Sequence, residues 1–234
     1  MYLGLDLGTS GLKGVLIDEV GVIAGSASAP LKVMRPNDGW SEQDPNDWIA
    51  AAEKVLDSLC AKYQSEMQAL CGIGLSGQMH GATAMDADGK AIRPCILWND
   101  TRSFAEAAEL DAIAKFRAIS GNIVFAGFTA PKLLWMQRHE PANFDRVHRI
   151  LLPKDVLRLW LTGEAISDFS DASGTSWLDV KKRDWSDDLL AATGMNRGQM
   201  PALVEGNAIG GQLRDKLAAR WNIPRQIPVA GGGG

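Results

Sequence analysis

The chain has 234 residues, of which 46% are apolar and 22% are charged, as in soluble globular proteins of one large or two small domains. Its 24 basic and 28 acidic residues are mixed along the chain and give a net charge of −4, which argues against nucleic-acid binding. No apolar run reaches the roughly 18 residues of a membrane span, and Met1 leads into the chain without a signal-peptide pattern. Cys60, Cys71 and Cys95 are odd in number and widely spaced. They predict buried apolar cysteines in a cytoplasmic protein, rather than disulfides or a zinc site.

Short apolar runs separated by turn residues predict three strands at the start of the chain, over residues 2–6, 12–18 and 22–29. The two connections are too short for a crossover helix, so the strands are expected to be antiparallel neighbours. A helix should follow, with Asp44 as its N-cap and Pro45 at its first position. Apolar residues from Trp48 onwards recur at helical spacing and predict its buried face.

The rest of the chain predicts further strands and mostly short helices. Strands are expected over residues 69–76, 82–85, 92–98 and 227–230. Helices are expected over residues 102–115, 131–138, 154–161, 186–194 and 212–221. This order of elements predicts a single α/β domain built on a mixed sheet. The last strand leads into a glycine-rich turn at the end of the chain, which favours a piece of a longer protein over a flexible tail.

The first hairpin has the composition of a phosphate-binding turn. Gly8 and Gly11 allow the backbone N–H groups to approach a phosphate closely. Thr9 and Ser10 add hydroxyl donors, and Lys13 adds a positive charge. The alternative is an ordinary hairpin made of common turn residues.

Asp6 ends the first predicted strand, where its carboxylate could hold Mg²⁺ through the water shell of the ion. The segment is not a Walker loop, because the Gly-Lys-Ser/Thr order is absent and a strand follows. Residues 72–77 match G-x-G-x-x-G, but the glycines lie within a strand and no helix follows, so a dinucleotide site is rejected. His80 is flanked by glycines at a strand end, a good place to meet a small polar molecule.

Together these segments resemble the N-terminal domain of the FGGY carbohydrate kinases over the whole chain. The residues that carry the resemblance are 4–10, 40–45, 77–81, 96–100, 127–135, 152–155 and 167–175. Residues 127–139 fit the N-terminal signature of that family at every fixed position, including Lys132 and Trp135. The Gln-Met-His-Gly form of residues 78–81 indicates xylulose as the sugar. Glycerol kinases instead carry an Arg-Glu pair at Met79 and His80 and a tyrosine near Gly127.

The resemblance implies a ribonuclease-H-like, actin-type α/β domain over residues 1–234, followed by a second kinase domain that is absent from this chain. The implied reaction transfers the γ-phosphate of ATP to D-xylulose and gives D-xylulose 5-phosphate, with ATP and Mg²⁺ as cofactors. Asp6 would act on Mg²⁺ through water. The implied phosphate-binding residues are Gly8, Thr9, Ser10 and Lys13, and the implied sugar-binding residues are Gln78, Met79 and His80.

In the family, an aspartate directly after the glycine turn is the general base, so the base is expected just after Gly234. The chain by itself is therefore expected to be inactive. The expected partners are D-xylulose and ATP, with no nucleic acid and no membrane, and a homodimer is left open. The alternatives are a glycerol, ribulose or other FGGY kinase, another actin-type ATPase, or a sugar-binding module without catalysis.

Overall fold

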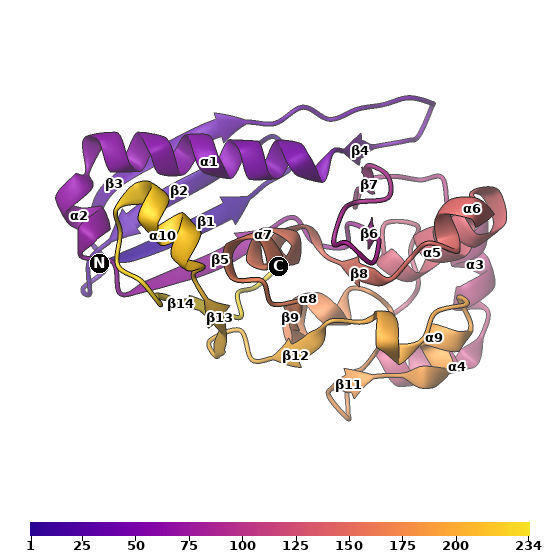
Figure 1. The fold of residues 1–234 in the computed structure, drawn as a ribbon. Coiled ribbons are helices and arrows are strands. Elements are labelled where there is room, and N and C mark those ends of the chain that lie inside the picture. The colour runs from indigo at the N-terminus through magenta and orange to yellow at the C-terminus, as the bar shows by residue number, and fades with distance from the viewer.

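The computed structural model describes all residues from Met1 to Gly234. A six-stranded mixed sheet, built from both ends of the chain, organises one half of the fold (Figure 1). The strand order is β13-β14-β5-β1-β2-β3, with β1 antiparallel to β2 and parallel to β5. The strands are β1 (Tyr2–Leu7), β2 (Gly11–Ile17), β3 (Ile23–Pro30), β5 (Gly72–Gly77), β13 (Ile209–Gln212) and β14 (Pro228–Ala230). The predicted mixed sheet and the three antiparallel N-terminal strands are confirmed.

One face of the sheet is buried beneath helices, because apolar side chains alternate along its strands. In β1, Leu3, Leu5 and Leu7 are buried, whereas Gly4 and Asp6 lie on the opposite, exposed face. The covering helices are α1 (Pro45–Lys62), α7 (Pro153–Thr162) and α10 (Asp215–Trp221) (Figure 1). Strands and helices share one core of 30 buried residues, which we call the sheet core.

Helix α1 begins where its sequence predicts. The Asp44 carboxylate accepts a hydrogen bond from the N–H of Asn46 at 2.9 Å, and Pro45 takes the first helical position. The apolar residues at helical spacing, from Trp48 to Leu59, are buried against the sheet. The N-cap and the periodicity therefore agree on both the start and the orientation of the helix.

The other half of the fold consists of short helices and two-stranded ribbons around a separate core of 22 buried residues, which we call the helical core. The strands are β4 (Glu42–Gln43), β6 (Thr83–Met85), β7 (Cys95–Ile96), β8 (Arg149–Leu151), β9 (Ile166–Asp168), β10 (Leu178–Asp179), β11 (Asp184–Trp185) and β12 (Ala202–Val204). The helices are α3 (Phe104–Asp111), α4 (Ala114–Ser120), α5 (Thr129–His139), α6 (Pro141–Phe144), α8 (Phe169–Ser173) and α9 (Asp187–Ala191), with a 3₁₀ turn at Arg197–Gln199. A further short helix, α2 (Gln64–Gln68), follows α1.

The helix expected over residues 102–115 is instead two helices, α3 and α4, with Ile113 in an extended conformation between them. Leu110 and Phe116 are both buried in the helical core. Six residues apart, they would lie roughly 120° from each other around a continuous helix. The break brings both side chains into the same core.

Three other expectations need correction. Within the predicted strand 92–98 only Cys95–Ile96 pairs, and the predicted helix 212–221 starts at Asp215 because Gln212 belongs to β13. Cys95 is buried as predicted, but Cys60 is half-buried and Cys71 is exposed. Cys71 lies just before β5, where its N–H bonds to the carbonyl of Met1 at the edge of the sheet core. No helix of the fold combines the length and apolarity that crossing a membrane requires.

Candidate active site

The exposed face of the sheet carries a row of polar side chains where β1 and β5 end. Asp6 is the register partner of Lys13 on β2 and of Ser76 on β5. Residues paired in register point to the same face, so these three side chains stand next to one another. The Ser76 hydroxyl donates to the Asp6 carboxylate at 3.0 Å. We call Asp6, Lys13 and Ser76 the polar row.

The predicted phosphate turn, Gly8, Thr9 and Ser10, lies one residue after Asp6 and connects β1 to β2. The backbone N–H groups of its three residues donate to no other backbone group, so they remain available for a phosphate oxygen. No group of three or more His, Cys, Asp or Glu side chains in the chain is arranged to hold a metal ion. The single exposed carboxylate of Asp6 nevertheless fits Mg²⁺, which takes one or two carboxylates and fills its other positions with water and phosphate oxygens.

The predicted sugar loop, Gln78 to His80, follows β5 as the phosphate turn follows β1. Because the two strands are parallel, both segments leave the same edge of the sheet. The Thr9 hydroxyl donates to Gln78 Oε1 at 3.1 Å, and Gln78 Nε2 donates to Gln43 Oε1 at 2.8 Å. Gln43 Nε2 in turn donates to the carbonyl of Thr9 at 2.7 Å. These bonds join the two predicted binding segments into one ring.

Gln43 is a site residue that sequence reasoning missed, although it lies inside one of the motifs that carry the family resemblance. The Gln78 side chain is buried, and both its amide oxygen and its amide nitrogen are hydrogen-bonded to other side chains of the ring. Met79, by contrast, is 43% exposed. Trp98 is 47% exposed and donates its indole N–H to the Thr9 hydroxyl at 3.0 Å, so an aromatic surface borders the site.

His80 is held in an unusual backbone conformation by helix α5. Its φ of 64° lies in the left-handed region, which is unfavourable for residues other than glycine. Its carbonyl accepts hydrogen bonds from the Thr129 hydroxyl at 3.1 Å and from Lys132 Nζ at 2.9 Å. Its ring packs against Phe128, with centroids 4.6 Å apart, and Nδ1 lies 2.9 Å from the carbonyl of Gly174. Both the backbone and the ring are therefore fixed from outside the loop.

Lys132 is fully buried and has no carboxylate in contact; its ammonium group donates to the carbonyls of His80 and Gly127, the latter at 2.6 Å. Burial lowers the pKa of Lys132 to about 7. The sequence marks this lysine only as a signature residue, and the structure shows what it touches. Lysine fits here because its long side chain brings a donor from α5 to two carbonyls at once.

Burial, and to a lesser degree the nearby Lys132, lowers the pKa of His80 from 6.5 to about 4. We therefore expect the wild type to lose free energy of unfolding relative to His80→Gln as the pH falls from about 6.5 to about 4. The sign follows because the unfolded histidine takes up its proton first. Urea titrations of both proteins at several pH values measure the difference, and parallel pH profiles would contradict the burial of a neutral imidazole.

The glycine turn at residues 231–234 also reaches the polar row. Gly233 pairs with Ser76 in a parallel bridge and donates its N–H to the carbonyl of Leu75 at 3.1 Å. Gly232 has a φ of 82°, and a side chain there would collide with the same carbonyl. Glycine is therefore required for the turn to lie this close to β5.

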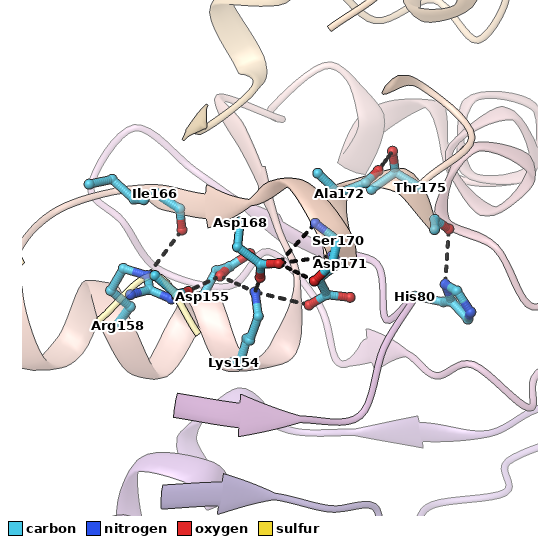
Figure 2. A network of polar contacts seen from close by, with 12 residues as sticks. His80, Lys154, Asp155, Arg158, Ile166, Asp168, Ser170, Asp171, Ala172 and Thr175 are labelled. Atoms are coloured by element: carbon cyan, nitrogen blue, oxygen red, sulfur yellow. Dashed lines mark hydrogen bonds and ion pairs between the residues drawn. The ribbon is translucent and has the colours of Figure 1, made fainter. Parts of the chain in front are cut away.

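A buried ion cluster contacts the start of this turn and consists of Lys154, Asp155, Arg158, Asp168 and Asp171 (Figure 2). Lys154 Nζ lies 2.7 Å from Asp155 Oδ1, 2.8 Å from Asp168 Oδ1 and 3.0 Å from Asp171 Oδ2. The Arg158 guanidinium donates to the carbonyls of Ala230 and Gly231. These hydrogen bonds join the cluster to the end of β14 and to the first residue of the turn.

The cluster places three carboxylates against two cations. Burial raises the pKa of Asp171 to about 6, in spite of the adjacent ammonium group of Lys154. Burial alone would lower the pKa of Lys154, but the surrounding carboxylates, Asp155 first, raise it above its ordinary value. The three aspartates of the cluster lie in the motifs at residues 152–155 and 167–175, but the sequence does not show that these motifs meet in the fold.

Comparisons with known proteins place this arrangement in a family. The profile described as "FGGY family of carbohydrate kinases, N-terminal domain" matches residues 1–234. The chain is 50% identical over 234 residues to the xylulose kinase of Klebsiella pneumoniae and 49% identical over 235 residues to that of Escherichia coli K12. All of this chain is covered in both comparisons, but it spans only 48% of either relative.

The solved structures agree. A crystal structure of a xyloylose kinase from Brucella ovis superposes with a TM-score of 0.99 at 60% identity, covering 100% of this chain and 48% of that one. A glycerol kinase from Plasmodium falciparum superposes with a TM-score of 0.90 at 20% identity, covering 100% of this chain and 48% of that one, which shows a shared fold alone. The predicted actin-like fold is confirmed. The chain belongs to the FGGY family of carbohydrate kinases and corresponds to the N-terminal domain of that family.

Proposed function

We propose that the full-length protein is an ATP-dependent kinase that phosphorylates D-xylulose to D-xylulose 5-phosphate. The observation that carries the proposal is the joining of the phosphate turn to the sugar loop through Thr9, Gln78 and Gln43, beside the polar row. A phosphoryl donor and a hydroxylated acceptor would have to meet at such a place. The relatives named xylulose kinase, at up to 50% identity, support xylulose as the acceptor.

Mg-ATP, when bound, supplies the phosphoryl group and the cation that neutralises its charge. In the proposed site, Asp6 holds the hydrated metal ion, while Lys13, Ser10 and the free N–H groups of residues 8–10 hold phosphate oxygens. Met79 and His80 contact the sugar, and Gln78 keeps their loop in register with the phosphate turn. These groups orient the acceptor and compensate charge.

We also propose that a second kinase domain supplies most of the nucleotide site, since the curated relatives are about twice as long as this chain. The resemblance implies a general-base aspartate directly after Gly234. The contact between Gly233 and Ser76 supports this position, because it brings the turn beside Asp6. Closure of two domains over the polar row would exclude water from the transferring phosphoryl group.

The test is a coupled assay of ADP release by the purified full-length protein with Mg-ATP and D-xylulose, D-ribulose or glycerol in turn. We expect D-xylulose to give the highest kcat/KM. A higher kcat/KM for glycerol or D-ribulose would overturn the assignment of the sugar while leaving the kinase family intact. Sugar binding by calorimetry without ADP release would instead identify a binding module.

His80→Ala in the full-length protein should raise the KM for D-xylulose and lower kcat/KM. The fall in kcat/KM should correspond to a loss of about 1–3 kcal/mol of transition-state stabilisation. The reason is that a sugar hydroxyl loses its partner in a partly buried site. The measurement is the same assay together with a thermal melt. An unchanged kcat/KM accompanied by a large drop in melting temperature would show that His80 is structural.

A further inference from the structure

Gly174 touches the His80 ring in two ways. Its carbonyl lies 2.9 Å from Nδ1, and a Cβ atom at position 174 would overlap both Nδ1 and the neighbouring Cε1 of the ring. Its φ of −75° and ψ of 0° are ordinary for any residue. The need for glycine therefore comes from the histidine and not from the backbone.

The contact with Gly174 determines where the hydrogen of the neutral imidazole resides. A carbonyl oxygen can only accept a hydrogen bond, so Nδ1 must carry the hydrogen and Nε2 is left as an acceptor. The hydrogen bond that the ring makes within the chain uses Nδ1 and not Nε2, and His80 is only partly buried. A bare ring nitrogen in this position accepts a hydrogen bond from a hydroxyl group.

The Gly174 carbonyl is itself held rigidly by α8. Asp168 caps this helix by accepting from the N–H of Asp171 at 3.1 Å, and both carboxylates bind Lys154 in the buried ion cluster (Figure 2). Beyond Gly174, the carbonyl of Thr175 accepts from the N–H of Ala130 at the start of α5. The acceptor for His80 is thus fixed between the cluster and the helix that also holds the backbone of His80.

We propose that Gly174 is a positioning residue that sets the tautomer and ring orientation of His80, so that Nε2 accepts a hydrogen bond from a substrate hydroxyl group. The hydroxyl donor is a polyol or ketose, and this part rests on the proposed function. Gly174 would act entirely through His80, since its main-chain oxygen is occupied by the ring and it has no side chain.

The experiment uses the full-length protein labelled with ¹⁵N-histidine, with the His80 signal assigned by its loss in His80→Gln. In the wild type we expect a protonated Nδ1 and a bare Nε2. Gly174→Ala should abolish this pattern and raise the KM for D-xylulose by about tenfold to a hundredfold, with a much smaller change in kcat. Ser173→Ala, one residue earlier on α8, should change neither quantity.

A double-mutant cycle separates this role from general damage to the loop. In a His80→Gln background, where no imidazole remains to be oriented, Gly174→Ala should raise KM by far less than in the wild type. An equal rise in both backgrounds would overturn the proposal, as would a wild-type spectrum with the hydrogen on Nε2. The spectra need no substrate, so a protein that phosphorylates no pentulose would refute the proposed function but not the tautomer.

Discussion

Lys154→Met should lower the free energy of unfolding by about 3–5 kcal/mol, because removal of one partner from a buried ion cluster leaves uncompensated charge. Three carboxylates, those of Asp155, Asp168 and Asp171, lie within 3.0 Å of the Lys154 ammonium group. Without it, only Arg158 would remain to balance them, and its guanidinium is shared with the carbonyls of Ala230 and Gly231. Urea unfolding followed by tryptophan fluorescence measures the loss.

The matched control is Lys115→Met, which removes a lysine that is 65% exposed in an ion pair with Asp188. Its effect should stay within about 0.5 kcal/mol. Acidification should restore part of the stability of Lys154→Met relative to the wild type, because protonation removes the charge from the stranded carboxylates. A Lys154→Met protein that unfolds like the control at neutral pH would show that the cluster tolerates its excess negative charge.

Asp6→Asn in the full-length protein should lower kcat about 10²- to 10³-fold while leaving the KM for the sugar nearly unchanged. The amide keeps the size of the side chain and can still accept from Ser76, but it lacks the charge that a hydrated metal ion requires. Initial rates at saturating Mg-ATP provide the measurement.

Asp88→Asn, in the exposed turn after β6, is the control and should leave the rates unchanged. If Asp6→Asn turns over like this control, the polar row does not act on the transferring phosphoryl group. A rise in the sugar KM without a loss of kcat would instead place Asp6 among the sugar ligands, contrary to its position next to the phosphate turn.

Local signals account for the parts of the fold that the sequence predicts well. The strands β1 to β3 are adjacent hairpins with clear alternation, and α1 carries its own cap, its own first-turn proline and a regular apolar face. Each signal acts within a few residues, so a single sequence displays it. Local signals also indicate that the predicted phosphate turn and the predicted sugar loop follow strands, and the parallel pairing of β1 with β5 explains why the two segments meet.

Contacts between distant segments account for what the sequence does not show. Gln43 joins the site through partners 34 and 35 residues away, and His80 meets Gly174 across 94 residues. Nothing in the sequence near Lys154 indicates that it binds three carboxylates, because two of them arrive on β9 and α8. The break between α3 and α4 is likewise decided by the need to bury Phe116 in the helical core.

The two separate cores give the domain a form of modularity. Residues 77–81 cross from the sheet core, which supports the polar row, to the helical core, which supports the surroundings of His80. Changes of side-chain volume in one interior need not be compensated in the other. A lineage can therefore remodel the half that surrounds the predicted sugar loop, and with it the proposed choice of substrate, while the strands beneath the predicted phosphate turn keep their packing.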